Sequence, residues 1–192
     1  MQRTEAPGVE LVKARQAIDR MKSAESLDDF EEDWKEFLRR LERCFNKIQA
    51  HYKKSPKWGG WFGRFSKTIS NDELLVYLRN ARGADEHSVE EIVGRSSSRI
   101  GLNPAVGDTI VIKNMVRRGG VIQSMEAPLG VSITFYPEKI KLLPITNRNA
   151  LYPVPKVHLE KPVNPFNVVD VAECGYRFYE SVLSDAEKYF VK

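Results

Sequence analysis

The stretch LDDFEEDWKEFLRRLERCFNKIQAHY, residues 27–52, shows the clearest periodicity in this chain of 192 residues. Apolar side chains recur there every three or four positions, at Leu27, Phe30, Trp34, Phe37, Leu41, Cys44 and Ile48. This spacing is typical of one face of an α-helix, and the dense charges between these positions suit the face turned to solvent. Ser26 precedes the pattern as an N-cap, and Asp28 and Asp29 suit the first turn. We therefore predict a long amphipathic helix over residues 27–52.

Three further helical patterns surround this segment. Residues 8–24 carry one apolar stripe, and residues 167–190 carry another. A third helix is expected to begin at Ser70, with Glu73 completing a capping box, and to continue through Ile92 and Val93 past a kink at Gly83. Together these helices predict a four-helix bundle formed by residues 8–98 plus 167–191.

Residues 107–144 have a different character, because they are rich in β-branched side chains. We expect one hairpin around the RRGG turn at 117–120, and a second formed by VSITFY (131–136) and KIKLLPI (139–145). Residues 145–165 contain four prolines and are expected to be extended. The predicted fold class is therefore α+β, a mainly helical bundle with a small antiparallel β insert, residues 105–165, between helices three and four.

Composition excludes several protein classes. The 3 Trp, 7 Tyr and 9 Phe argue against disorder, and no apolar run reaches the length of a membrane span. We expect a soluble, cytoplasmic protein without membrane contact, in which Cys44 and Cys174 are reduced core thiols. The sequence has no CxxC pair, HExxH motif or phosphate-binding glycine loop, so we predict no metal and no cofactor.

Positive charge is unevenly distributed along the chain, whose net charge is +4. No acidic residue lies between Glu42 and Asp72, whereas that interval holds seven cations, which are Arg43, Lys47, Lys53, Lys54, Lys57, Arg64 and Lys67. Such a region attracts polyanions, of which nucleic acid is the commonest. A merely solubilising surface is an equally open interpretation.

The segment KKSPKWGGWFGRFSK, residues 53–67, is expected to be a loop, because Pro56 and three glycines interrupt the helical pattern. Trp58 and Trp61 could stack nucleic-acid bases there, with Lys53, Lys54, Lys57, Arg64 and Lys67 holding phosphates. The alternative, which we favour, is an aromatic plug over one end of the bundle, since an exposed Trp is costly.

The segment DELLVYLRNARGADEHSVEEIV, residues 72–93, concentrates polar side chains, which are Arg79, Asn80, Arg82, Asp85, Glu86 and His87. Arginine with histidine, in the absence of a metal motif, suits cleavage of RNA, whose 2′-hydroxyl is the nucleophile. His87 would transfer the proton, and Arg82 would donate two hydrogen bonds to the phosphate. Arg79, Asn80 and Glu86 would support them.

This segment resembles the HEPN superfamily, whose mark is a helical bundle with Arg, four to six residues, and then His on a late helix. The match is Arg82-Gly-Ala-Asp-Glu-His87, and the resemblance would cover residues 8–95 and 167–191. It implies a metal-independent ribonuclease of the kind found in toxin–antitoxin and phage-defence systems. It also implies a homodimer in which the two Arg-x-His segments face each other, RNA as a partner, and an antitoxin-type protein as a further partner.

Three alternatives stay open. Arg82 and His87 lie about 140° apart on a straight helix, so one protomer alone makes a poor site, and the residues could be a surface salt-bridge set. Gly83 stands where the family commonly has Asn, which favours a non-catalytic binding or accessory module of the same fold. A third class is nucleic-acid binding without turnover, through the RRGG turn and the basic loop.

Overall fold

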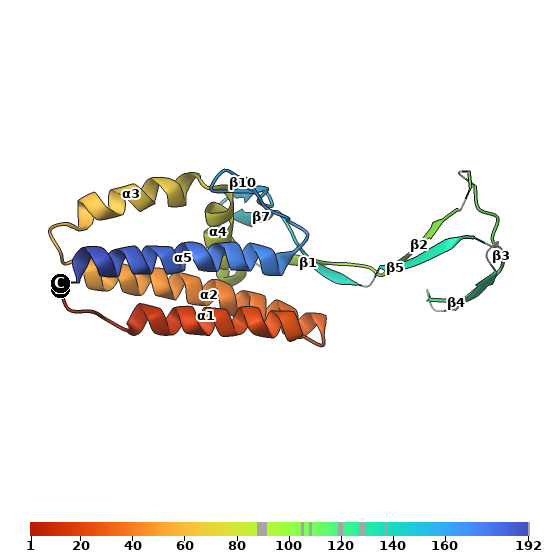
Figure 1. Ribbon diagram of the computed structural model, residues 1–192, viewed down its shortest axis with the longest axis horizontal. Coiled ribbons are helices and arrows are strands. Elements are labelled where there is room, and N and C mark those ends of the chain that lie inside the picture. The colour runs from red at the N-terminus through yellow and green to blue at the C-terminus, as the bar shows by residue number, and fades with distance from the viewer. Residues whose placement is uncertain are drawn as a thin grey trace. The chain divides into compact units, whose positions relative to one another are not determined.

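The computed structural model describes residues 1–87, 92–104, 106–107, 109–118, 121–126, 130–136 and 138–191, with the side chains of residues 85–87 and 121 outside this description. Within these ranges the chain is α+β, and its five helices make up about half of it (Figure 1). The helices are α1 (Ala6–Ser23), α2 (Leu27–Tyr52), α3 (Trp58–Asn71), α4 (Glu73–His87) and α5 (Val168–Phe190).

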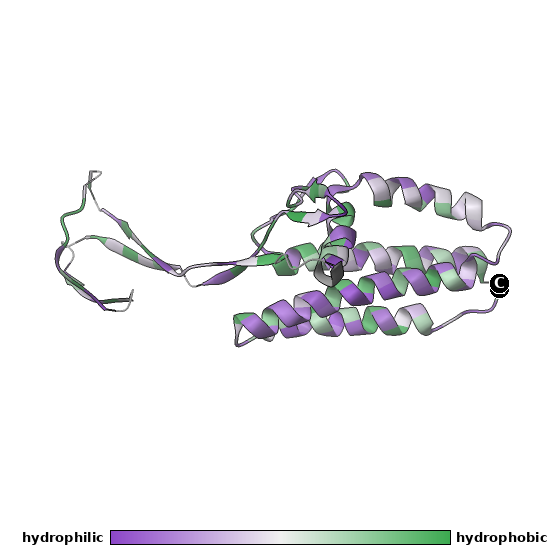
Figure 2. Cartoon of the chain, turned by 180° about the vertical axis from the view of Figure 1, so that it is seen from behind, coloured by the Kyte–Doolittle hydropathy of each residue, from purple (hydrophilic) through white to green (hydrophobic). Residues whose placement is uncertain are grey.

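The three long helices α1, α2 and α5 lie side by side, and each packs against the other two. Hydrophilic and hydrophobic residues alternate along them, as amphipathic helices require (Figure 2). Ser26 Oγ accepts a hydrogen bond from Asp29 N at 3.1 Å, so the predicted helix 27–52 and its cap are confirmed. Asn167 caps α5 in the same way through Asp170 N. From Trp34 onward the apolar stripe of α2 is buried and forms the centre of the core, with Trp34, Phe37, Cys44 and Ile48 fully inaccessible to water.

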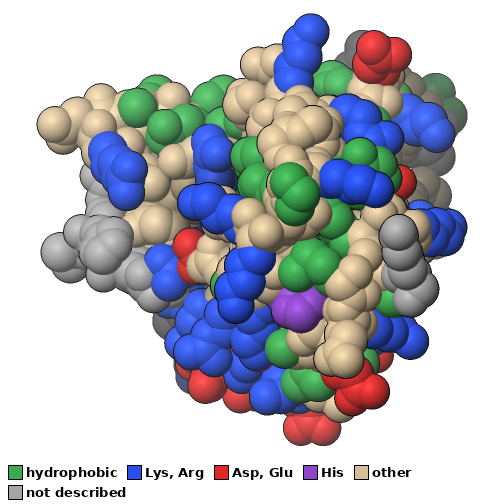
Figure 3. Space-filling view, turned by 90° about the vertical axis from the view of Figure 1, so that its left-hand side faces the viewer, with side chains coloured by type: hydrophobic (Ala, Val, Ile, Leu, Met, Phe, Trp, Pro, Cys, Tyr) green, Lys and Arg blue, Asp and Glu red, His purple; other side chains and the backbone are tan. Residues whose placement is uncertain are grey.

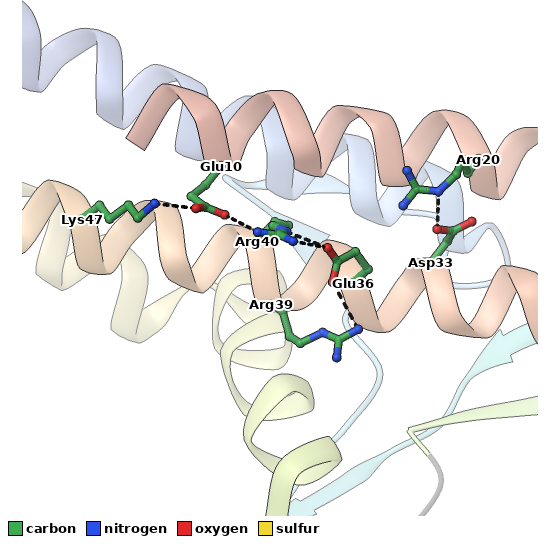
Figure 4. Close-up of polar contacts among 7 residues, drawn as sticks. All are labelled: Glu10, Arg20, Asp33, Glu36, Arg39, Arg40 and Lys47. Atoms are coloured by element: carbon green, nitrogen blue, oxygen red, sulfur yellow. Dashed lines mark hydrogen bonds and ion pairs between the residues drawn. The ribbon is translucent and has the colours of Figure 1, made fainter. Parts of the chain in front are cut away.

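A charged network joins α1 to α2 (Figure 4). Glu10 on α1 is only 4% exposed, and its carboxylate lies 2.8 Å from Arg40 Nη1 and 2.5 Å from Lys47 Nζ, both on α2. Glu36 contacts Arg40 at 2.6 Å and Arg39 at 3.2 Å. A buried carboxylate requires such partners, so the network fixes the register of the two helices.

The prediction of a loop over residues 53–67 is wrong, because residues from Trp58 onward form α3. Trp58, Trp61 and Phe65 recur at helical spacing and pack inward, which outweighs the low helix propensity of the glycines. Ser70 lies inside α3 and donates to Ser66 O, so it is not the predicted cap. Asp72 instead accepts from Leu75 N at 2.9 Å at the start of α4.

The strands form separate two-stranded pairs. They are β1 (Val93–Ser96), β2 (Arg99–Asn103), β3 (Lys113–Arg118), β4 (Val121–Glu126), β5 (Ser132–Tyr136), β6 (Lys139–Leu142), β7 (Ile145–Asn147), β8 (Ala150–Tyr152), β9 (Val157–His158) and β10 (Lys161–Pro162). Strand β1 pairs with β6, and β2 with β5. The remaining neighbours in sequence pair as antiparallel hairpins, which are β3–β4, β7–β8 and β9–β10.

Pairing of β3 with β4 confirms the first predicted hairpin. The second is wrong, because β5 and β6 each pair with a strand from before residue 104 rather than with each other. The third predicted helix does not reach Val93, which begins β1. A local pattern of β-branched residues identifies strands but does not specify their partners.

The chain divides into two compact units, residues 1–94 with 140–192 and residues 95–139. The Pro-rich segment that we assigned to the insert therefore belongs to the helical unit. Contacts with α4 explain this, since Tyr77 Oη donates to Leu143 O at 2.7 Å and Glu73 accepts from Lys156 N at 3.0 Å. Among the described helices, none has the length and apolar character to cross a membrane.

Candidate functional site

A cleft of about 500 Å³ lies among α2, α3, α4 and α5 within the helical unit. Its apolar walls are Leu38, Leu41, Phe45, Phe62, Ile69, Leu78 and Tyr179. Its polar lining is Glu42, Asn46, Ser66, Lys67, Ser70, Arg79 and Arg82. The cleft therefore combines a large apolar surface with a small set of charged groups, which is the usual composition of a ligand site.

Two of the predicted site residues, Arg79 and Arg82, line this cleft from α4. Residues three positions apart lie on the same face of a helix, so α4 presents both guanidinium groups to one side. Lys67, from near the end of α3, also lines the cleft. Three cations against one acid, Glu42, give the cleft a positive lining that suits an anion.

Arg82 forms an ion pair with that acid, because its Nε lies 2.5 Å from Glu42 Oε2. The Arg82 side chain is 21% exposed and that of Glu42 is 37% exposed. The pair joins α4 to α2 across the cleft and holds the guanidinium at its wall. An anionic ligand at Arg82 therefore competes with the Glu42 carboxylate.

Aromatic side chains form part of the cleft wall. Phe45 lies 6.1 Å from Phe62 and 6.2 Å from Tyr179, measured between ring centroids. Burial raises the pKa of Tyr179 to about 12, so its phenol stays neutral at physiological pH. Tyr179 therefore adds apolar surface and no charge to the cleft.

Asn80, a predicted supporting residue, is engaged elsewhere. It is 7% exposed, donates to Val76 O at 2.8 Å, and accepts from Asn147 Nδ2 on β7 at 3.0 Å. A Cβ at Gly83 would come within 2.7 Å of the same Asn147 nitrogen, so glycine permits this close approach. Asn80 and Gly83 thus form the contact between α4 and β7, and α4 continues unbroken through Gly83.

Glu86 and His87 lie in the last turn of α4. Their side chains fall outside the described residues, as does that of Asp85. The two halves of the predicted Arg-His pair therefore share one helix, and only Arg82 has a described side-chain position.

The five cations that were predicted to hold phosphates, here called the basic track, lie on different surfaces. Lys53, Lys54 and Lys57 are exposed where α2 ends and α3 begins, and Lys and Arg side chains cover much of that end (Figure 3). Arg64 is exposed and lies 3.5 Å from Asp185 on α5. Of the five track residues, only Lys67 lines the cleft with Arg79 and Arg82.

The stacking role predicted for Trp58 and Trp61 is wrong, because the two indoles are 8% and 0% exposed. Both pack against the ring of Phe190 on α5, and Trp61 Nε1 donates to Asp185 at 2.6 Å. Their ring faces are occupied by protein, so they hold α3 against α5. This arrangement agrees with the aromatic plug.

His158 is not among the site residues predicted from the sequence, yet its side chain is only 10% exposed. Its Nδ1 lies 3.0 Å from Asp72 Oδ1, and Leu159 N donates to Asp72 Oδ2 at 2.7 Å. Burial alone would raise the pKa of Asp72, but hydrogen bonds from His158, Leu159 and Leu75 outweigh it and lower the pKa. The partners lie 86 positions apart, and no sequence pattern links them.

Cys44 is fully buried, and burial raises its pKa to about 12, so it stays a thiol. Among the residues that the structure describes, no group of three His, Cys, Asp or Glu side chains could hold a metal ion.

Comparison with known proteins found no protein that is similar to this chain. No protein-family model matches the chain, and neither the curated proteins nor the solved structures give a match.

Proposed function

We propose that this chain is an HEPN-like, metal-independent ribonuclease in which Arg82 binds the scissile phosphate and His87 transfers the proton. The observation that carries the proposal is that Arg79 and Arg82, on one face of α4, line the same cleft as Lys67. The HEPN resemblance supplies the helical-bundle framework and the role of His87.

The chemistry uses the nucleophile that RNA itself provides. The 2′-hydroxyl oxygen attacks phosphorus as a base removes its proton, and the 5′-oxygen leaves with a proton from an acid. The products are a 2′,3′-cyclic phosphate and a 5′-hydroxyl. Guanidinium groups stabilise the charge that develops on the phosphorus-bound oxygens, which is the task assigned to Arg82 with Arg79 in support.

The apolar walls of the cleft suit a nucleobase beside the phosphate. Phe45 and Phe62 line the same cavity as the three cations. Aromatic surface next to positive charge is the usual means of binding single-stranded nucleic acid. This arrangement favours an unpaired RNA segment over a duplex.

The proposal includes a homodimer. Arg82 and His87 project from positions about 140° apart on one helix. The HEPN resemblance places the equivalent segment of a second protomer opposite the first, so that arginine and histidine from two chains complete one site.

A second candidate is a non-catalytic binding module that assembles with an antitoxin-type protein. The observation that favours it is the Arg82–Glu42 ion pair, which balances the charge of the guanidinium without any ligand. In this candidate the pair is a structural tie between α2 and α4, and the cleft receives an apolar, acidic segment of the partner.

RNA affinity tests the binding step. We expect Arg82→Ala and Arg79→Ala each to weaken binding of a fluorescent single-stranded RNA and to reduce the slope of log affinity against log salt by about 0.7. Glu42→Gln should strengthen binding, because it removes the competing carboxylate. The matched control is Lys13→Ala, an exposed lysine on α1 outside the cleft, which should leave affinity unchanged. Equal effects at Lys13 and Arg82 would contradict a phosphate site in the cleft.

Toxicity on overexpression separates the two candidates. A ribonuclease should arrest growth of the expressing cells, and Arg82→Ala or His87→Ala should relieve the arrest. A binding module should show no such relief, because its effect on growth does not depend on His87.

A further inference from the structure

One end of the helical unit is formed by the end of α2, the turn into α3 and the end of α5 (Figure 1). Lys53, Lys54 and Lys57 are exposed in that turn. Backbone hydrogen bonds hold the turn in place, among them one from Trp58 N to Ser55 O at 3.0 Å. The three ammonium groups are therefore presented from an ordered backbone, on the end that Figure 3 shows rich in Lys and Arg.

Acidic neighbours do not neutralise these three lysines. The sequence has no Asp or Glu between Glu42 and Asp72. Within the described part of the chain, none of the three forms an ion pair with a carboxylate. Lys47, one and a half turns before the end of α2, differs from them because it is paired with the buried Glu10. The turn therefore keeps a positive potential that attracts anions.

Tyr189, in the last turn of α5, extends this positive surface to Arg64. Its ring is 44% exposed, and the centroid lies 6.0 Å from Lys57 Nζ and 5.4 Å from Arg64 Cζ. Residues seven positions apart lie on one side of a helix, so Lys57 and Arg64 reach the same ring from α3. The attraction between cation and ring holds both side chains at the surface, which reduces the freedom that they lose on binding a ligand.

The acids in the last two turns of α5 already have partners. Glu187 lies 3.0 Å from Arg3 Nε. Asp185 accepts from Trp61 Nε1 at 2.6 Å and lies 3.5 Å from Arg64 Nη2. The Arg64 contact is long, and both of its side chains are about half exposed, so solvent screens it. Arg64 can therefore bind an anion without breaking a strong pair.

We propose that this bundle-end surface, formed by Lys53, Lys54, Lys57, Arg64 and Tyr189, binds the phosphate backbone of single-stranded RNA outside the cleft. The proposal rests on the proposed function in naming RNA as the polyanion. None of the five residues lines the cleft, so the surface is a second site rather than part of the first. A strand held at two sites gains affinity because the second contact forms within one complex.

Helix α3 gives the strand a path between the two sites. Lys57 begins this path at the bundle end, and Lys67 lines the cleft ten residues later. Ten residues of α-helix span about 15 Å. A strand that follows α3 over this distance reaches from the bundle-end surface to the cations of the cleft.

A membrane surface fits these residues less well. Binding at a membrane surface usually combines cations with apolar side chains that enter the lipid. Within residues 49–65 and 184–191, Tyr189 is the one exposed large apolar side chain. Trp58 and Trp61, which could enter lipid, are buried. Charge without insertable apolar surface favours a polyanion in solution.

The test uses oligouridylates with 2′-O-methyl groups, which cannot be cleaved through the 2′-hydroxyl. One probe has about 20 nucleotides, more than a typical single-strand site covers, and the other is a trinucleotide that fills only the cleft. The triple variant Lys53→Ala with Lys54→Ala and Lys57→Ala should bind the long probe about tenfold more weakly and reduce the slope of log affinity against log salt by about 2. Its affinity for the trinucleotide should not change.

A second triple variant is the matched control. It replaces Lys13, Lys156 and Lys161 by Ala, which are exposed lysines of the helical unit outside the cleft and the bundle-end surface. Because distant charges are screened, affinity for the long probe should stay within about twofold of wild type at about 0.1 M salt. Circular dichroism and thermal unfolding should show that both variants remain folded.

Tyr189 provides an independent check on the arrangement of the cations. Tyr189→Ala should weaken binding of the long probe about threefold, because Lys57 and Arg64 lose the ring that holds them at the surface. Tyr189→Phe keeps the ring and should bind as the wild type does.

Three results would overturn the proposal. They are unchanged affinity of the Lys53, Lys54 and Lys57 variant for the long probe, equal losses in the two triple variants, and an equal loss for the trinucleotide. Dependence on the three lysines only in binding to vesicles of equal parts phosphatidylcholine and phosphatidylserine would overturn it too, and would assign the surface to a membrane.

Failure of this proposal and failure of the proposed function give different results. RNA binding that depends on the three lysines, in a chain that cleaves no RNA, would support the bundle-end surface and contradict the ribonuclease. Cleavage that depends on Arg82, with long-probe binding unaffected by the three lysines, would do the reverse.

Discussion

Glu10 illustrates how single residues hold the helical unit together. Burial alone would raise the pKa of its carboxyl, but the ion pairs and hydrogen bonds with Lys47 and Arg40 outweigh burial and lower the pKa to about 2. The ordinary value is 4.5, so the folded state favours the ionised form. Stability that depends on this carboxylate is complete above pH 4.5 and is lost as the pH falls toward 2.

Glu10→Gln should therefore lower the free energy of unfolding near neutral pH by about 2 kcal/mol, because Arg40 and Lys47 lose their shared carboxylate. The difference in free energy of unfolding between wild type and variant should become smaller in acid, because Glu10 of the wild type becomes protonated there. Urea unfolding at several pH values measures both effects.

Asp33→Asn is the control for this substitution. Asp33 also joins α1 to α2, through Arg20 at 2.7 Å, but that arginine side chain is 53% exposed. Solvent screening limits the contribution of an exposed ion pair to the free energy of unfolding to less than about 1 kcal/mol. Equal losses in the two variants would show that burial of Glu10 adds nothing.

At the scale of elements, the glycines of α3 and α5 occupy opposite environments. A Cβ added at Gly63 in α3 would have no neighbour within 4 Å. A Cβ added at Gly175 in α5 would come within 2.5 Å of Leu78 Cδ1 on α4. Gly175 thus permits the close packing of α5 on α4, whereas Gly63 only weakens its own helix.

Gly63→Ala should raise the free energy of unfolding by about 0.5–1 kcal/mol through helix propensity. Gly175→Ala should lower the free energy of unfolding by about 1–2 kcal/mol, because the cost of overpacking against Leu78 exceeds the gain in helix propensity. Thermal and urea unfolding of the two variants measure the difference. Stabilisation by both substitutions would contradict the tight α4–α5 contact.

The same elements show what the sequence can predict. Helices α2 and α5 were predictable to within a residue, because an apolar stripe and a capping side chain agree at each. Helix α3 was missed, because local propensity counts three glycines and a nearby proline against it. The burial of Trp58 and Trp61 against Phe190 decides the outcome, and that contact spans more than 120 positions.

Strand partners were harder to predict, because pairing too depends on contacts between residues that lie far apart in the sequence. The pattern of VSITFY marks a strand, and β5 does form there. Its partner β2 lies about 30 positions earlier, in a stretch that was assigned neither to the predicted bundle nor to the predicted insert. Pairing depends on side chains across the ribbon, such as Tyr136 over Gly101, which a single-strand pattern does not contain.

At the scale of the whole molecule, stability should reside in the helical unit. No described residue between Arg95 and Lys139 is buried, so that unit contributes little apolar burial to the monomer. Replacing residues 97–138 by a short Gly-Ser turn should leave the unfolding free energy of the monomer within about 1 kcal/mol. Urea unfolding at low protein concentration measures this. A loss of several kcal/mol would contradict the division into two units.

The candidate site was partly predictable at this scale. Arg79 and Arg82 share a helix face by their spacing, so their common position in the cleft follows from sequence. Glu42 and Lys67 join them only through the packing of α2, α3 and α4, which no local pattern encodes. The Glu42–Arg82 pair is the feature that most changes the expected chemistry, because an anion that binds Arg82 would have to compete with the Glu42 carboxylate.

The most direct measurement is cleavage of a mixed RNA panel by the purified chain in excess EDTA, beside Arg82→Ala, His87→Ala and the Lys13→Ala control. We predict cleavage that persists in EDTA, leaves 2′,3′-cyclic phosphate ends, is lost in the first two variants and is unchanged in the third. No cleavage by the wild type at micromolar concentration, or equal cleavage by His87→Ala, would contradict the ribonuclease proposal and leave the cleft to a binding partner.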